Sequence, residues 1–225
     1  MIQGLTIKSG WHWVAFAAAV AHPIFVSLIG ALPFVSPLLY RDDHSYFINF
    51  WGTDIAAGWI VTLLIVACLR LSGAGPSAIG LRLPRAWVLF LLVLAAIALA
   101  VTIGLMPVHS SSMKPPVLPT LPRTHREHWF MLFVVAPSAA VCEETIYRGL
   151  LMRFMATIIA LWPAMIVQAL LFAYMHGGFA QPRFLMVNGS IVGFLLALLV
   201  NWRGDLRAAI GIHFLIDALQ FSLVP

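Results

Sequence analysis

The sequence predicts an all-α fold, a polytopic membrane bundle of roughly six to eight transmembrane helices, with about seven as the best count. Two observations carry this prediction. Of the 225 residues, 62% are hydrophobic and only 9% are charged, whereas a soluble domain has about 25% charged residues. The apolar residues form runs of about 20, the length that one bilayer crossing needs. This composition excludes an ordinary soluble enzyme, a disordered chain and a disulfide scaffold.

The N-terminal part of the chain holds three predicted spans. They lie at residues 13–31, 46–69 and 86–106, and each is a mainly apolar run bounded by polar or turn-forming residues. A polar connector at 36–45 and a Gly-, Ser- and Pro-rich loop at 71–85 separate them. Residues 109–125 are rich in proline and serine, so we expect no regular helix there.

A long apolar stretch at residues 127–161 follows. Because it is longer than one bilayer crossing, we expect a helix that is tilted, kinked near Pro137 or partly interfacial. Three further spans are predicted at 162–176, 184–200 and 206–223. No internal repeat is visible, so we expect a single integral membrane domain over residues 1–225, with its functional core at 127–223.

The chain is basic, with 13 Lys and Arg against 8 Asp and Glu and a net charge of +5. Because the basic residues lie singly between apolar runs, they are typical of the loops of a membrane protein and not of a nucleic-acid-binding surface. Cys68 and Cys142 lie inside apolar runs and are expected to be buried thiols without a disulfide. We therefore expect the lipid bilayer, and no nucleic acid, as a partner.

A few ionisable residues lie inside the predicted spans. Placing Asp, Glu or Arg at the centre of a bilayer costs about 2.5–3.5 kcal/mol on insertion scales, so such residues are candidates for function. The residues of this kind, together with two histidines, are Asp54, Glu143, Glu144, Arg148, His176, His213 and Asp217. Asp54 has no evident motif around it, and we expect it to pair with Arg70 or with an arginine of a loop.

The segment CEETIYR contains a carboxylate with a partner and one without. Glu144 and Arg148 are four residues apart, so they lie on one helix face and can form an ion pair. Glu143 points about 100° away around the helix and has no local partner. An unpaired carboxylate can accept a proton from water as a general base. The alternative is that all three residues form one neutralised structural triad.

Two histidines repeat the four-residue spacing. His213 lies one helical turn before Asp217, which can orient the imidazole, and Phe172 lies one turn before His176. If the chain turns near residue 161, Glu143 lies 18 residues before the turn and His176 lies 15 after it, which puts both within about 5 Å of one depth. His213 is only about two turns into its span, so a tilt or a re-entrant turn would have to bring it to that depth.

These residues resemble the CPBP intramembrane peptidases, also called the ABI or CAAX-protease-like family. Glu143, Glu144 and Arg148 match the EExxxR motif of that family, Phe172 and His176 its FxxxH motif, and His213 and Asp217 its HxxxN/D motif. The motifs follow one another in the order of the family. The first three spans are similar to the family only in their hydrophobicity.

The resemblance implies a glutamic-type intramembrane endopeptidase, a hydrolase that cleaves a membrane-anchored protein or peptide with an activated water. The implied catalytic set is Glu143, His176, His213 and Asp217, and the implied supporting set is Glu144, Arg148 and Phe172. Glu143 would be the general base, with His176 as its partner. No metal or other cofactor is expected, and the chain would be a multi-pass protein of a bacterial or archaeal cell membrane.

The resemblance also places His213 and Asp217 beside the oxyanion. CAAX-type enzymes carry Asn at the last motif position, and Asn can donate a hydrogen bond, whereas Asp217 cannot unless it is protonated. We therefore expect Asp217 to orient His213, so that the imidazolium of His213 donates to the oxyanion.

Two other functions stay open. Two imidazoles and two carboxylates are enough to hold zinc in an intramembrane metalloprotease, although the chain has no HExxH motif. A non-catalytic membrane protein in bacteriocin immunity or transport could use the same polar residues, for example as a proton relay. A transporter usually shows two similar halves, and none are visible here. Cys142 is not favoured as a nucleophile, because no base is spaced to activate it.

Overall fold

The computed structural model describes residues 5, 9–30, 43–81, 122–176 and 183–222. Besides a long central helix, they form α1 (Gly10–Gly30), α3 (Asp43–Leu71), the 3-10 turn η1 (Pro76–Ile79), α8 (Leu161–Met175), α9 (Arg183–Arg203) and α10 (Arg207–Ser222). These residues contain no strand, which confirms the all-α prediction, and each helix coincides with a predicted span to within a few residues. The predicted span at 86–106 lies outside the described residues.

The central helix runs without a break from His125 to Met155. It comprises α5 (His125–Phe130), the π-helical segment η2 (Met131–Val135), α6 (Ala136–Glu143), the π-helical segment η3 (Glu144–Leu151) and α7 (Met152–Met155). A capping box fixes its start: the Thr124 hydroxyl accepts from the N–H of Glu127 at 3.2 Å, and the Glu127 carboxylate accepts from the N–H of Thr124 at 2.9 Å.

The predicted end of this helix near residue 161 is wrong. The helix stops at Met155, and residues 156–160 form the turn to α8. The hydroxyl of Thr157 donates to the carbonyl of Phe154 at 2.7 Å, and Ala160 has a φ of 69°. A left-handed residue cannot continue a right-handed helix, so the chain reverses at this point.

A kink near Pro137 is one expectation for this helix. The helix is continuous there, and its hydrogen-bond pattern changes. Proline has no N–H, so it removes one bond of the regular ladder. Directly before it, the N–H of Ala136, the residue after η2, reaches back five residues to the carbonyl of Met131. A second stretch of this kind, η3, contains both Glu144 and Arg148. Such π-helical segments occur frequently at functional sites.

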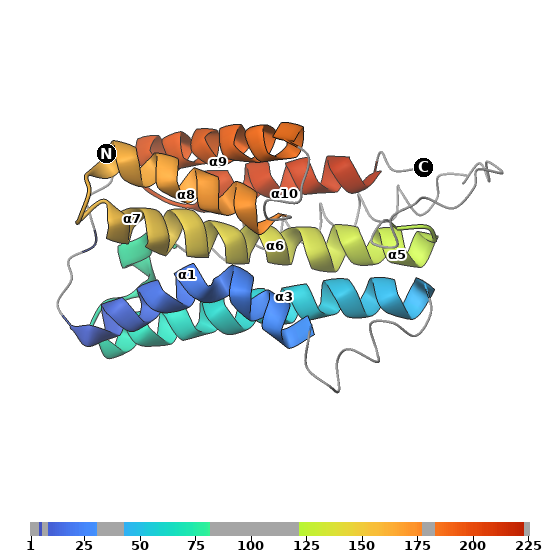
Figure 1. The fold of residues 1–225 in the computed structure, drawn as a ribbon, viewed down its shortest axis with the longest axis horizontal. Helices are drawn as coiled ribbons and strands as arrows, with labels where there is room; N and C mark the ends of the chain where they lie inside the picture. Colours follow the sequence, from blue (N-terminus) through green and yellow to red (C-terminus); the bar gives the residue numbers. More distant parts are fainter. Residues whose placement is uncertain (1–4, 6–8, 31–42, 82–121, 177–182, 223–225) are drawn as a thin grey trace, which may run out of the picture.

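The central helix lies between two groups of helices (Figure 1). α1 and α3 pack on one side of it, and α8, α9 and α10 pack on the other. Apolar clusters fill the space on both sides of it. One includes Ala15, Ile65 and Leu150, another includes Met152 and Leu206, and a third includes Phe47, Met131 and Val135. The central helix therefore presents side chains to both halves of the molecule.

Small residues let α8 and α9 approach closely. A Cβ atom added at Gly189 would lie 3.2 Å from the Cβ of Ala173, and one at Gly193 would lie 3.2 Å from the Cα of Ala169. The two glycines are four residues apart, as are the two alanines, so each pair lies on one helix face. Close packing through small residues is typical of helices that associate within membranes.

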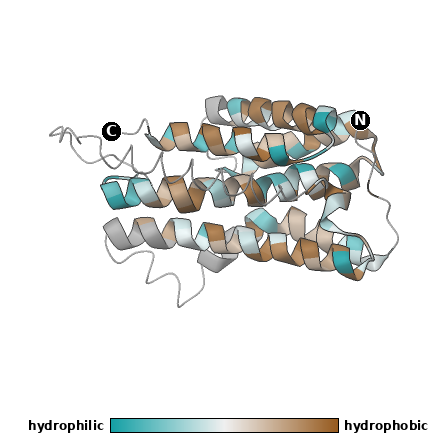
Figure 2. Ribbon diagram, turned by 180° about the vertical axis from the view of Figure 1, so that it is seen from behind, coloured by the Kyte–Doolittle hydropathy of each residue, from teal (hydrophilic) through white to brown (hydrophobic). Residues whose placement is uncertain are grey.

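The lengths and surfaces of the helices are those of a membrane protein. Three helices are long and apolar enough to cross a bilayer: Phe50–Leu71, His125–Met155 and Met186–Arg203. Leu161–Met175 is shorter but also apolar. Large apolar side chains such as Leu63, Ile166 and Leu219 are exposed, and Figure 2 shows hydrophobic residues along the helices of both groups. Contact with lipid accounts for this exposure. The number of crossings stays a prediction.

Candidate active site

The predicted ion pair between Glu144 and Arg148 is confirmed. Nη1 of Arg148 donates to Oε1 of Glu144 at 2.8 Å, and both side chains are fully buried, with 0% exposure. A buried charge is costly unless it is paired and hydrogen-bonded. The pair therefore allows one carboxylate and one guanidinium to lie in the middle of the helix bundle.

Glu144 also holds His213, which sequence spacing did not indicate. Nδ1 of His213 donates to the same Oε1 of Glu144 at 2.8 Å. The hydrogen-bond partner of this histidine is therefore Glu144, and an orienting role for Asp217 stays a prediction. Oδ2 of Asp217 lies 3.6 Å from Nε2 of His213, which is beyond hydrogen-bond length. Because Glu144 takes Nδ1, the other ring nitrogen of His213 faces Glu143.

Glu143 lies between the two histidines. Its Oε2 is 3.8 Å from Nε2 of His176 and 3.7 Å from Nε2 of His213. This oxygen is buried and has no hydrogen-bond partner among the described residues. Polar atoms at such distances are commonly bridged by water. The free carboxylate predicted at Glu143 is therefore the point on which the two imidazoles converge.

The orientation of His176 is fixed by its own helix. Its Nδ1 donates to the carbonyl of Phe172 at 2.8 Å. A neutral imidazole that donates from Nδ1 carries a lone pair on Nε2. His176 and Glu143 therefore present two acceptors to each other, and a water molecule can donate to both.

His213 reaches the depth of Glu143 without a re-entrant turn. Nη2 of Arg153 donates to the carbonyl of Gly204 at 3.2 Å, so the turn between α9 and α10 lies beside Arg153. Glu143 is 10 residues before Arg153, and His213 is 9 residues after Gly204. At about 1.5 Å per residue, both rise about 14–15 Å from that common level.

Phe172 packs at the centre of these side chains. Cζ of Arg148 lies 4.0 Å from the centre of the Phe172 ring, which is a cation–π contact. The same ring centre is 4.7 Å from that of His176 and 5.7 Å from that of His213. The motif residue Phe172 therefore touches both histidines and the arginine.

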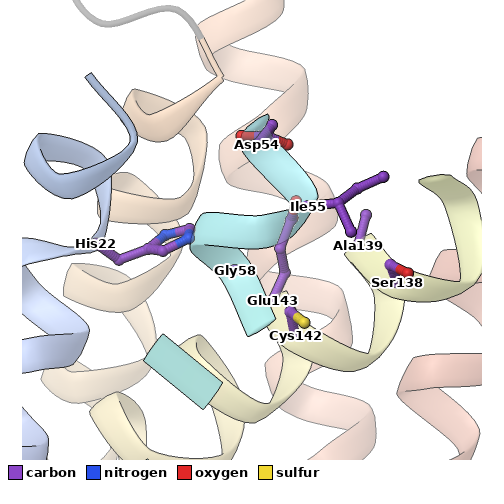
Figure 3. A pocket seen from close by; sticks show the side chains of 8 residues that line it. All are labelled: His22, Asp54, Ile55, Gly58, Ser138, Ala139, Cys142 and Glu143. Carbon is purple, nitrogen blue, oxygen red and sulfur yellow. The ribbon is translucent and has the colours of Figure 1, made fainter. Parts of the chain in front are cut away.

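A small pocket lies beside Glu143, roughly the size of one water molecule (Figure 3). Its lining residues are His22 of α1, Asp54, Ile55 and Gly58 of α3, and Ser138, Ala139, Cys142 and Glu143 of α6. The expected pairing of Asp54 with Arg70 is wrong. Arg70 is 16 residues further along α3, about 24 Å away, whereas Asp54 shares this pocket with Glu143. The sequence motifs do not include Asp54, because it lies in α3 and not in a helix that carries a motif.

The fold and these side chains define an all-α membrane protein with a polar site buried between its helices. Residues 125–219 match the family described as type II CAAX prenyl endopeptidase Rce1-like. The match contains all three motifs, so it confirms the resemblance drawn from them. It includes the helices from α5 to α10 and leaves out α1 and α3.

One curated relative is the uncharacterized protein YpbD of Bacillus subtilis (strain 168), which is 35% identical over 80 residues. The aligned part is 36% of this chain and 38% of YpbD. The chain therefore matches well under half the length of this relative. No solved structure matches the chain.

Proposed function

We propose that the protein is an intramembrane endopeptidase that hydrolyses a peptide bond with a water activated by Glu143 and His176. One observation carries the proposal. The buried Oε2 of Glu143 has no hydrogen-bond partner among the described residues, and Nε2 atoms of two histidines lie 3.7 and 3.8 Å from it. The match of residues 125–219 to the Rce1-like family supports a protease of the CAAX type.

In the proposed reaction, the water lies between Glu143 and His176 and donates a hydrogen bond to each. Glu143 accepts one proton while the water oxygen bonds to the carbonyl carbon of the substrate. The carbonyl oxygen becomes an oxyanion. When the C–N bond breaks, Glu143 returns the proton to the leaving amine, so that the carboxylate is restored.

His213 is the proposed donor to the oxyanion. Its Nδ1 is bound to the carboxylate of Glu144, which favours the imidazolium form and leaves Nε2–H to donate. Asp217, at 3.6 Å from Nε2, adds negative charge near the ring. Glu144, Arg148 and Phe172 support the site by fixing the positions of the two imidazoles.

The proposed substrate is a membrane-anchored protein or peptide. The site is enclosed by helices whose outer faces are apolar, so a substrate with a lipid anchor or an apolar segment could approach from within the bilayer. The match to a family of CAAX prenyl endopeptidases favours a prenylated C-terminal segment.

The test is Glu143→Gln in purified protein, assayed with a farnesylated peptide, and in cells, by comparing membrane and secreted proteins for uncleaved precursors. We expect cleavage to be lost while the protein folds normally. Glu127→Gln is the matched control, because it makes the same change on the same helix and a glutamine retains the capping box. Cleavage that survives Glu143→Gln would disprove the proposal. A cellular effect that persists without cleavage would favour the non-catalytic alternative.

A chelator separates the proposal from the zinc alternative. Among the described residues, no group of three His, Cys, Asp or Glu side chains is arranged to hold a metal ion. We propose a reaction without a metal, so activity should survive treatment with a strong zinc chelator. Activity that is lost on chelation and restored by zinc would favour a metalloprotease.

A further inference from the structure

The pocket beside Glu143 has a second polar wall. The catalytic histidines do not line it; its far side consists of His22 from α1 and of Asp54 and Gly58 from α3. In Figure 3 the side chain of Glu143 rises from α6 toward the turn of α3 that carries Asp54. α1 and α3 lie outside the segment that matches the family. The pocket is therefore assembled from both parts of the chain.

His22 has polar capacity that the described residues do not satisfy. Its side chain is buried, with 3% exposure, and its Nδ1 has no hydrogen-bond partner among them. Figure 3 shows its ring extending from α1 toward α3, with the nitrogens foremost. Buried polar groups are normally hydrogen-bonded to protein or to an ordered water. An unpartnered ring nitrogen at a pocket therefore points to a small polar ligand.

Three polar groups that line the pocket can all form hydrogen bonds with a water molecule in it. The carboxylates of Asp54 and Glu143 are acceptors, and an imidazole N–H of His22 is a donor. A buried water typically makes about three hydrogen bonds. A water here can donate one hydrogen to each carboxylate and accept one bond from His22. This arrangement satisfies the water and also separates two negative charges.

Gly58 keeps the pocket open. A Cβ atom added at this position would lie 3.3 Å from Cβ of Cys142 and 4.0 Å from Nε2 of His22. Any larger residue here would push into the pocket that lies between α1, α3 and α6. The pocket therefore exists because residue 58 is a glycine.

We propose that Asp54 and His22 bind a second, resident water behind Glu143, and that Asp54 is a positioning residue for the general base. The resident water donates to the side of the Glu143 carboxylate that faces α3, and this bond fixes the carboxylate. The other side of the carboxylate accepts from the reacting water. This inference rests on the proposed hydrolysis by Glu143. It adds His22 of α1 and Asp54 of α3 to the residues that determine the rate of hydrolysis.

The first test compares Asp54→Leu and Asp54→Asn in the peptide assay. Leucine removes both acceptor oxygens, and we expect kcat to fall about 10- to 100-fold with KM unchanged, because the general base loses its fixed position. Asparagine keeps one acceptor oxygen, so kcat should recover to an intermediate value. Thr53→Val is the control on the neighbouring residue and should leave kcat unchanged. Equal losses in the leucine and asparagine variants, accompanied by a raised KM, would overturn the inference.

The second test fills the pocket without removing a polar group. Gly58→Ala should displace the resident water and lower kcat, again without a change in KM. Gly52→Ala is the matched control, because a Cβ atom at Gly52 would meet nothing within 4 Å on the same helix. If Glu143→Gln is inactive while Asp54→Leu and Gly58→Ala keep the kcat of the unmodified protein, this inference fails and the proposed hydrolysis stands. If Glu143→Gln is active, both fail.

Discussion

Nδ1 of His213 donates to Oε1 of Glu144 at 2.8 Å, although the two residues are 69 positions apart in the chain. The same oxygen accepts from Nη1 of Arg148. One carboxylate oxygen therefore fixes the imidazole of α10 and neutralises a guanidinium of the central helix. The adjacent residue, Glu143, instead has its Oε2 near Nε2 of both His176 and His213, at 3.8 and 3.7 Å.

This bond predicts unequal effects of two acidic residues. Glu144→Ala should lower kcat strongly, by about 10- to 100-fold, because His213 loses its orientation. Asp217→Asn should lower it by less than about threefold, because Asp217 makes no hydrogen bond to His213 at 3.6 Å. Both variants are measured with a farnesylated peptide at saturating concentration. A larger loss in Asp217→Asn than in Glu144→Ala would show that Asp217 orients the histidine after all.

Removing Arg148 should destabilise the fold. Arg148→Met leaves Glu144 as a buried charge with one partner fewer, which costs about 3–5 kcal/mol in comparable buried pairs. The measurement is unfolding of the purified protein in detergent, by heat or denaturant. Arg70→Met is the control, since Arg70 is an exposed arginine in the last turn of α3 and should change stability little. The double variant Glu144→Gln/Arg148→Met should recover part of the loss, and no recovery would contradict the pairing.

Two glycines with left-handed backbones should respond differently to alanine. Gly73 has a φ of 79° and Gly80 a φ of 77°, so alanine costs about 1–2 kcal/mol of backbone strain at either position. At Gly80 the added Cβ atom would also overlap the guanidinium of Arg153, which bonds to the carbonyl of Gly204. We expect Gly80→Ala to lower the thermal midpoint clearly more than Gly73→Ala. Equal shifts would show that Arg153 moves away freely.

Asp205, in the turn between α9 and α10, should make stability depend on pH. Its Oδ2 accepts from Nη2 of Arg207 at 2.7 Å, and this hydrogen bond holds the pKa of Asp205 below its usual value. A depressed pKa stabilises the folded state above the unfolded value of about 3.9, and the contribution is lost as pH falls through the folded pKa. Asp205→Asn should therefore be less stable than the unmodified protein at pH 7, and the difference should shrink on acidification. A difference that is constant with pH would refute this account.

Local spacing predicted the parts of the structure that depend on one helix. The four-residue spacing of Glu144 and Arg148 predicted their ion pair. The lengths of the apolar runs predicted the described helices, except the end of the central one, to within a few residues. The meeting of Glu143 and His176 followed from counting residues from one turn, since the two helices are consecutive and antiparallel.

Other contacts depend on how distant segments pack, so spacing could not predict them. The bond from His213 to Glu144 joins α10 to the central helix. The depth of His213 in the bundle is set by the contact of Arg153 with Gly204. Asp54 faces Glu143 through a helix pairing that no motif records. The central helix ends at Met155, and Ala160 has a left-handed backbone just before α8, although an alanine carries no sequence signal of a turn.

The composition of the pocket wall has a consequence for judging related chains. His22 and Asp54 lie in helices that the family match does not include. A relative could keep all three motifs intact and still carry leucine where this chain has Asp54. Inspection of its motifs would count it as a competent enzyme, although its turnover would be slow. Under the role proposed for His22 and Asp54, the identity of these two side chains is a separate criterion for activity, beyond the three motifs.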